Sequence, residues 1–217
     1  MPEGSGSAAA VTLGEQATSS SYRSFDIFGP ELAKTPLIDN RLAGQIFYLS
    51  AGHGGLDPGA MAQRSGRNLC EDEYAYDVTL RLCRNIIAHG GVAYMINRDP
   101  NDGIRNTEYL NCDTDETLWG GVRMVANQKG RLTQRTDIIN ALYQENLAKG
   151  NQRQTLICIH VDSRNSSKRL DLFFYYYAGN VLAKARANRM QQVMRKNTKV
   201  RKAATTLEPS RPETYTS

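Results

Sequence analysis

Short apolar runs alternate with longer segments of helical pattern, and this alternation constrains the fold more than any other feature of the sequence. Runs rich in β-branched and aromatic residues occupy positions 46–49, 92–96 and 155–161. Helical patterns lie between them, at positions 71–89 and 131–147. Strands that alternate with helices are typical of α/β proteins, so we predict a mixed central sheet with flanking helices.

The first helical segment has clear start and stop signals. Three acidic residues, Glu71, Asp72 and Glu73, occupy its first turn, where negative charge complements the helix dipole. Gly90 and Gly91 follow its last turn and predict its end.

The remaining segments carry weaker signals. Positions 1–44 are rich in Gly, Ser, Ala and Thr, which predicts a flexible lead-in. Positions 97–130 are polar with several turn signals and predict an excursion over the surface. The string DLFFYYY at 171–177 predicts a fourth buried strand, and 181–198 predicts a helix. The chain is thus expected to have three parts: a lead-in (1–44), a core (45–180) and a basic helix with a disordered tail (181–217).

Composition places the chain among globular proteins. Its 217 residues are 40% hydrophobic and 23% charged, which suffices for one domain with a core of its own. No apolar run approaches the ~20 residues of a membrane-spanning helix, so we expect no span, and no signal-peptide pattern is visible.

None of the four cysteines forms a CxxC pair, and we expect all four to be free, since a chain of this size rarely needs a disulfide framework. They are Cys70, Cys83, Cys112 and Cys158, and the last lies in a strand run expected to be buried.

Positive charge is concentrated near the C-terminal end. Positions 181–202 hold eight basic residues and no acidic ones, within a chain of net charge +5. One interpretation is an arm for nucleic acid or another anionic polymer, and the alternative is a solvated helix face. Aromatic residues are not interleaved with the charges, so we expect no nucleic-acid partner.

Two of the three histidines follow predicted strands. His53 lies in a glycine-rich loop after the first strand, and His160 lies at the end of the third. Ligands gather beyond the carboxyl ends of strands in such sheets, so both are expected on one rim. Zinc hydrolases commonly use three protein ligands and keep one position for water. A carboxylate from Glu71, Asp72 or Glu73 would complete the set.

Each of these residues also has an ordinary structural interpretation. A histidine in a turn is more often a hydrogen-bonding residue than a ligand, and an acid at a helix start is more often a cap or dipole partner. His89, which precedes Gly90 and Gly91, is expected to serve as a charge at the helix C-terminus.

Longer motifs around the candidate ligands resemble those of the type-3 N-acetylmuramoyl-L-alanine amidases. The string SAGHGGLDPGA at 50–60 resembles that family's GHGGxDPGA signature. The string IHVDS at 159–163 resembles its IHxNS strand end, with Asp162 where Asn is usual. The run EDEYAYDVTLRL from Glu71 is similar to its ligand-bearing helix start, and that register assigns the metal-binding glutamate to Glu71, with Glu73 as the alternative.

Further matches extend the resemblance to positions 46–177. The sequence of the central segment most resembles amidases of the Bacteroidetes type. Arg135 belongs to a helix motif that resembles LxxRxxxAN, and Arg98 falls where an arginine ends the second strand. The resemblance implies one Zn²⁺ held by His53, Glu71 and His160. It also implies hydrolysis of the amide between N-acetylmuramic acid and L-alanine in peptidoglycan, in the periplasm or cell envelope. Peptidoglycan or a muropeptide is therefore the expected partner.

One part of the family pattern has no counterpart. A glutamate in a late strand, in a motif like VxxELGNxxN, normally serves as general base. The only acids after position 180, Glu208 and Glu213, lie in a Pro-rich tail with nothing to orient them. We therefore predict an incomplete catalytic core with impaired activity. The alternative is a non-catalytic peptidoglycan-binding or regulatory protein built on a degenerate amidase core.

The tail suggests a cause for this loss. Read one frame off, the codons permitted for positions 207–216 include Gly-Thr-Val-Thr-Ser-Arg-Asp-Leu-Tyr, a segment of the kind that Bacteroidetes-type amidases carry after the corresponding helix. Our hypothesis is a frame shift between about positions 179 and 205, which would make the basic run an artefact. Resequencing the locus tests it, because an open downstream frame should encode the lost glutamate strand.

Overall fold

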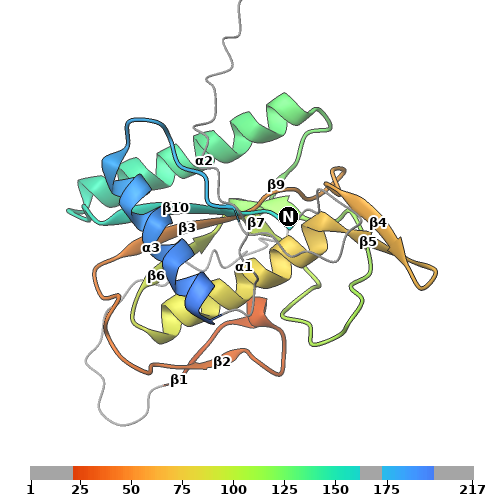
Figure 1. Cartoon of the computed structure of the whole chain (residues 1–217), viewed down its shortest axis with the longest axis horizontal. Coiled ribbons are helices and arrows are strands. Elements are labelled where there is room, and N and C mark those ends of the chain that lie inside the picture. Colours follow the sequence, from red (N-terminus) through yellow and green to blue (C-terminus); the bar gives the residue numbers. More distant parts are fainter. Residues whose placement is uncertain (1–21, 162–172, 198–217) are drawn as a thin grey trace, which may run out of the picture. The chain divides into compact units, whose positions relative to one another are not determined.

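A three-stranded parallel sheet forms the centre of the fold in the computed structural model, which describes residues 22–161 and 173–197. The chain divides into two units, Met1–Asp162 and Ser163–Ser217. In the first unit, β3 (Ile46–Ala51) lies between β10 (Gln154–Ile159) and β6 (Val92–Met95), as Figure 1 shows. All three strands run parallel, with Leu49 opposite Ile157 and Met95. The predicted α/β architecture is confirmed.

The helix α1 (Glu71–Ala88) covers one face of this sheet. Its buried residues Tyr76, Leu80 and Cys83 pack with Leu49 and Met95 of the strands in one apolar cluster. The helix ends where predicted, since Gly90 follows it with a φ of +80° that favours glycine.

The helix α2 (Gln128–Ala148) covers the opposite face. Its start is capped by Asn127, whose side-chain oxygen accepts a hydrogen bond from the Gly130 amide at 2.6 Å. Leu142 packs with Tyr48 and Tyr94 in a second apolar cluster. The strands that carry the candidate ligands are thus fixed from both sides.

Part of the predicted flexible lead-in is ordered. Residues 22–44 include β1 (Tyr22–Ser24), η1 (Asp26–Phe28) and β2 (Lys34–Pro36), and β1 pairs with β2. Phe28 is fully buried in the cluster beneath α1. A two-stranded ribbon with one aromatic anchor is too short to show periodicity, which is why the prediction was wrong for these residues. Residues 1–21 lie outside the described part of the chain.

The polar segment after β6 carries a small antiparallel sheet. It consists of β7 (Asn97–Arg98), β8 (Thr117–Leu118) and β9 (Val122–Arg123), with η2 (Trp119–Gly121) between the last two.

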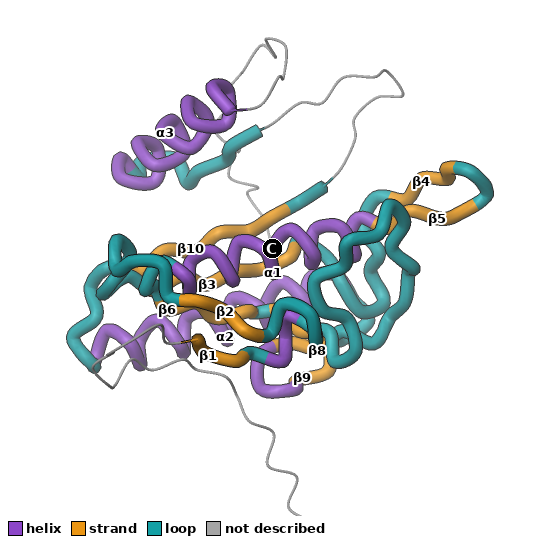
Figure 2. Tube along the Cα trace, turned by 90° about the horizontal axis from the view of Figure 1, so that it is seen from below, coloured by secondary structure: helices purple, strands orange, loops and turns teal. Residues whose placement is uncertain are grey.

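A hairpin precedes α1 and was not predicted. It consists of β4 (Met61–Arg64) and β5 (Arg67–Cys70) and projects from the body of the unit in Figure 2. Ser65 and Gly66 form its turn, both with positive φ.

The expectation of four free cysteines was wrong. Cys70 and Cys112 form a disulfide with their Cα atoms 5.7 Å apart, which ties the start of α1 to the segment between β7 and β8. Because the expectation rested on chain size, it could not detect a bridge that fastens one long loop. Cys83 and Cys158 are free.

The strand β10 is less buried than its apolar sequence predicted. Leu156 is 48% exposed and Cys158 is also exposed. Among the described residues β10 pairs with β3 alone, so it is an edge strand of this sheet, with fewer neighbours than the central β3.

The described part of the second unit contains α3 (Val181–Asn197), the helix predicted from propensity. The predicted strand at 171–177 was wrong, because residues 173–177 are irregular and Tyr177 is 81% exposed. An aromatic run favours a strand only where another strand pairs with it. Positions 171–172 and 198–217 lie outside the described residues. Among the described residues, no helix has the length and apolar character needed to cross a membrane.

Candidate metal centre

Three side chains from distant parts of the chain converge at the carboxyl edge of the sheet. His53 follows β3, Glu71 is the first residue of α1, and His160 follows β10. Each offers one ligand atom, and these atoms lie within 4.8 Å of one another. The strand order explains the meeting, because β3 and β10 are parallel neighbours and α1 begins beside their ends.

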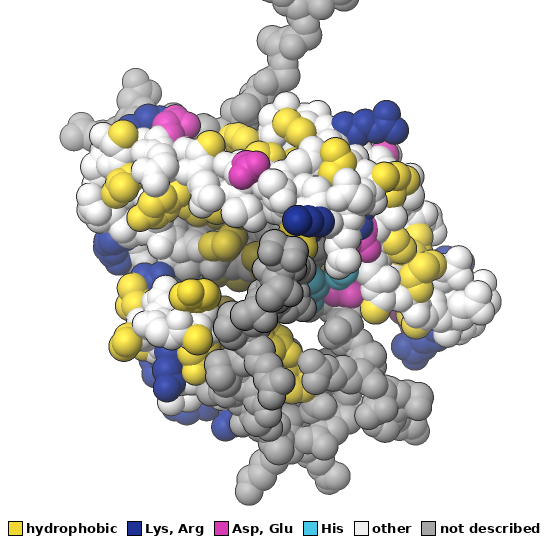
Figure 3. Space-filling view, turned by 90° about the horizontal axis from the view of Figure 1, so that it is seen from above, with side chains coloured by type: hydrophobic (Ala, Val, Ile, Leu, Met, Phe, Trp, Pro, Cys, Tyr) yellow, Lys and Arg dark blue, Asp and Glu magenta, His cyan; other side chains and the backbone are white. Residues whose placement is uncertain are grey.

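The spacing of the three groups suits a tetrahedral ion. Nε2 of His53 lies 3.4 Å from Oε2 of Glu71, and Nδ1 of His160 lies 3.0 Å from Oε1. Two ligands bound at about 2.0–2.1 Å to a tetrahedral zinc ion lie about 3.4 Å apart. The side chain of Glu71 is only 3% exposed, whereas that of His160 is 53% exposed, so the centre opens to solvent on the His160 side. Figure 3 shows histidine and acidic side chains together at the surface.

The carboxylate of Glu71 is held in its charged form. Burial acts to raise its pKa, but the hydrogen bond from the Ala60 amide and the two neighbouring imidazoles outweigh burial and lower the pKa. The amide of Val161 also donates to Oε1 at 3.2 Å. A deprotonated carboxylate is the form that binds a metal ion.

The ring of His53 is oriented from its other nitrogen. Nδ1 lies 3.2 Å from Oδ1 of Asp57, and Arg131 donates to Oδ2 of the same carboxylate at 2.9 Å. The two atoms lie at contact distance without the alignment of a hydrogen bond, since Nδ1 of His53 has no hydrogen-bond partner among the described residues. A carboxylate on this side of the ring is the usual outer-shell arrangement of zinc sites and leaves Nε2 for the metal.

The backbone at His53 is fixed by two buried polar side chains. Arg135 donates to the carbonyls of Gly52 and His53, the latter at 2.9 Å. Asn97 donates to the His53 carbonyl at 2.8 Å and accepts from Ser50 at 2.8 Å. The loop is thus held by β7 through Asn97 and by α2 through Arg135.

Two glycines make room for the ligands. A Cβ atom on Gly52 would lie 2.1–2.6 Å from the ring of His160, and a Cβ atom on Gly59 would lie 2.6 Å from the ring of His53. No real Cβ atom tolerates such distances. The glycines of the loop are therefore required by the close packing of the imidazoles as well as by the turn.

The other predicted candidates lie outside the centre. Glu73 is 1% exposed and binds Arg105 at 3.0 Å, and burial raises its pKa to about 7. Burial also raises the pKa of Asp72 to about 6, and one of its oxygens accepts the Glu73 amide. His89 caps the far end of α1 and pairs with Asp39 at 2.9 Å. Asp162 lies outside the described residues.

Sequence reasoning missed the residues that support the ligands. Asp57 and Arg135 belong to the motifs, but their positions predict no role, because a carboxylate behind a histidine is visible only in three dimensions. Arg131 had one available signal, since it lies four residues before Arg135 and both therefore face the same side of α2.

We expect Asp57→Asn to lower the zinc affinity of the protein about 10- to 100-fold. The amide keeps the size of the side chain but no longer provides the negative charge behind His53. Competition with a chromophoric chelator measures the affinity. Asp137→Asn, on the exposed surface of α2, is the matched control. An unchanged zinc affinity in Asp57→Asn would show that Asp57 stabilises the loop and does not support zinc binding.

Comparison with known families completes the description of the site. The family model described as N-acetylmuramoyl-L-alanine amidase matches residues 48–212, well over half of the chain. Searches of curated proteins and of solved structures gave no match. The matched region contains all three residues of the candidate centre.

Proposed function

Because the chain belongs to the N-acetylmuramoyl-L-alanine amidase family, we propose that its centre binds Zn²⁺ and serves to hydrolyse the amide between N-acetylmuramic acid and L-alanine in peptidoglycan. The observation that carries this proposal is the convergence of His53, Glu71 and His160 within ligand distance. Two imidazoles and one carboxylate form a ligand set that suits zinc and leaves a position open.

A zinc ion held there would supply a water of lowered pKa and would polarise the scissile carbonyl. The surrounding residues of the chain orient the groups that would hold the zinc ion. His53 is oriented by Asp57, and Glu71 by the amides of Ala60 and Val161. The exposed side at His160 gives a polymeric substrate access to the site. Action on peptidoglycan places the protein in the cell envelope, and we propose the periplasm as its compartment.

Metal analysis of the purified protein tests the proposal. We expect about one zinc ion per chain, lost in His53→Ala and in His160→Ala and retained in His89→Ala. His89 is the matched control because it is the remaining histidine and lies at the opposite end of α1. If zinc persisted in both His53→Ala and His160→Ala, this centre would be excluded as the zinc-binding site.

We further propose that turnover is impaired. In the described part of the chain, the carboxylates that contact the two histidines are Glu71 and Asp57, and both already hold other partners. Neither is placed to act as general base, and Glu208 and Glu213 lie outside the described residues. Loss of a general base costs about 100- to 10,000-fold in rate.

This observation also favours a second candidate function, namely peptidoglycan binding without hydrolysis. Incubation of purified muropeptides with the zinc-loaded protein separates the two. Release of stem peptide supports the hydrolase, whereas zinc-dependent retention on sacculi without release supports the binding protein.

The division of the chain and the frame shift stay proposals. The family match runs through α3 to residue 212, past the whole interval of about residues 179–205 in which the shift is proposed, so the match counts against a change of frame there. Sequencing of the locus across these codons tests the hypothesis.

A further inference from the structure

A buried carboxylate outside the metal centre has an oxygen without a partner. Asp99 follows β7 and is 6% exposed. Its Oδ1 accepts the amides of Asn101 and Asp102 at 3.0 and 2.8 Å, whereas its buried Oδ2 has no hydrogen-bond partner. A buried charged oxygen without a partner is costly, so this position calls for a positive group.

More acidic side chains lie close to this carboxylate. Asp99, Asp113 and Asp115 each offer a carboxylate oxygen, and these atoms lie within 4.8 Å of one another. Asp102 and Glu73 form an adjoining group with Asp99. Burial raises the pKa of Asp99, and the nearby Asp102 and Asp115 raise it further, which is the expected effect of crowded like charges.

The nearby Arg105 pairs with Glu73 and Asp102 rather than with Asp99, Asp113 or Asp115. Arg105 donates to Glu73 at 3.0 Å and also to Asp102. Within residues 22–161 and 173–197, no lysine or arginine forms an ion pair with Asp99, Asp113 or Asp115. Among the described residues, these three carboxylates therefore face one another without an ion-pair partner of their own, and Arg105 acts on Asp99 only through its longer-range charge.

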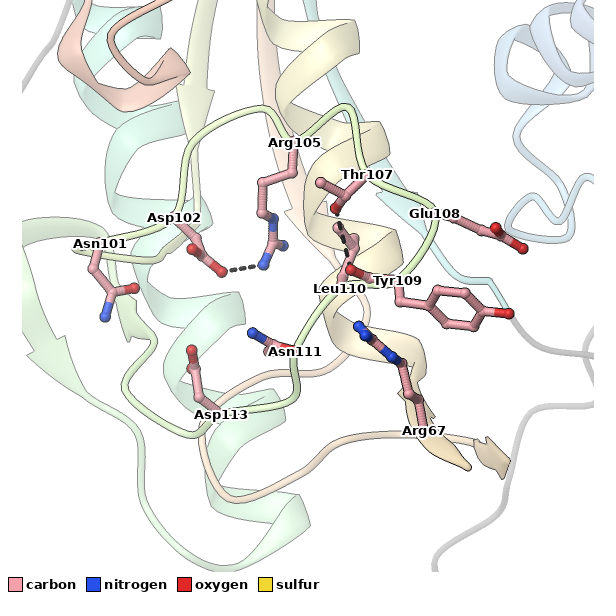
Figure 4. A pocket seen from close by; sticks show the side chains of 10 residues that line it. All are labelled: Arg67, Asn101, Asp102, Arg105, Thr107, Glu108, Tyr109, Leu110, Asn111 and Asp113. Carbon is pink, nitrogen blue, oxygen red and sulfur yellow. Dashed lines mark hydrogen bonds and ion pairs between the residues drawn. The ribbon is translucent and has the colours of Figure 1, made fainter. Parts of the chain in front are cut away.

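We propose that Asp99, Asp113 and Asp115 form a Ca²⁺ site, distinct from the zinc centre. An all-oxygen ligand set suits a hard cation rather than zinc. Calcium accepts 6–8 oxygens at about 2.3–2.6 Å, so two of its ligands lie at most about 5 Å apart. Asp113 and Asn101 border a cavity of about 750 Å³, shown in Figure 4, which leaves room for the waters that complete the coordination.

Calcium at this site would order the loop beside the zinc centre. The amide of Asp113 donates to Oε1 of Glu73 at 2.9 Å, and the neighbouring Cys112 is bonded to Cys70. Cys70 directly precedes the zinc ligand Glu71. Bound calcium should thus stabilise the loop from β7 to β8 and, through it, the start of α1.

Thermal unfolding of the zinc-loaded protein tests this site. We expect 10 mM CaCl₂ to raise Tm by about 5 °C relative to NaCl of equal ionic strength, as for a site with a Kd near 10⁻⁴–10⁻³ M. Asp99→Asn and Asp115→Asn should each lose this shift, while Asp137→Asn keeps it. In calcium-free buffer Asp99→Asn should be no less stable than the parent, because its amide retains an acceptor for both backbone amides and removes one charge.

The outcomes separate this site from the zinc centre. His53→Ala should lose zinc and keep the calcium shift, whereas Asp99→Asn should lose the shift and keep zinc. No shift in the parent protein, an equal shift with MgCl₂, or a full shift in both aspartate variants would overturn the proposal. Asp115 is exposed, so its variant tests the site even if Asp99→Asn does not fold.

Discussion

Replacing Cys70 and Cys112 with serine is expected to lower the free energy of unfolding by about 4 kcal/mol, as the chain-entropy relation gives for a loop of this length. The two cysteines are 42 residues apart, and the bridge limits the freedom of that whole segment in the unfolded chain. Natural domains are stable by about 5–15 kcal/mol, so the loss is a large fraction of the total.

Calorimetry under non-reducing conditions measures this effect. We expect Tm to fall by about 10 °C in the double variant. Cys158→Ser is the matched control, because Cys158 is free and exposed. Thiol titration of the denatured parent protein should find the two free thiols of Cys83 and Cys158, and four reactive thiols without added reductant would contradict the bridge.

Gly52→Ala is expected to weaken zinc binding on the order of 1,000-fold, more than the 10- to 100-fold effect of an outer-shell change. The added Cβ atom would lie 2.1 Å from Cε1 of His160, so the ring must move away from the centre. Because the His160 side chain is 53% exposed, it can move into solvent while the fold persists. We therefore expect loss of metal affinity with little change in Tm.

Chelator competition and circular dichroism measure the two quantities. Gly44→Ala is a suitable control, since no atom lies within 4 Å of a Cβ added there. Its φ of +71° costs about 1–2 kcal/mol of backbone strain. Zinc binding by Gly52→Ala at the affinity of the parent would show that the imidazole of His160 is dispensable.

The regular core could be predicted because its elements are long and its patterns are local. β3, α1, β6, α2 and β10 all lie where apolar runs and helix signals predict them. The ordered ribbon near Phe28 and the hairpin before α1 could not be predicted, since each is short and depends on contacts with distant residues. The strand predicted at 171–177 was wrong for the opposite reason, because its composition favours a strand but the described residues there have no partner strand.

The candidate ligands are visible in the sequence as strand-end histidines and a helix-start acid. Their support is not visible, because Asp57, Asn97 and Arg135 act through the carbonyls and ring nitrogens of residues up to 83 positions away. The acidic group at Asp99 also escaped notice, since its members lie within an apparently ordinary polar loop. The motif register assigns the metal-binding glutamate to Glu71, and the structure brings Glu71 rather than Glu73 together with His53 and His160.

The distribution of the three ligands along the chain has a consequence for folding. His160 and Glu71 are 89 positions apart, and their strand and helix meet only through parallel crossovers. Contacts of such long sequence separation form late, since loop closure must precede them. The third candidate ligand joins the first two only when β10 pairs with β3, so zinc binding should coincide with that step of folding. The time course of metal uptake during refolding would then measure when the edge strand β10 pairs with β3.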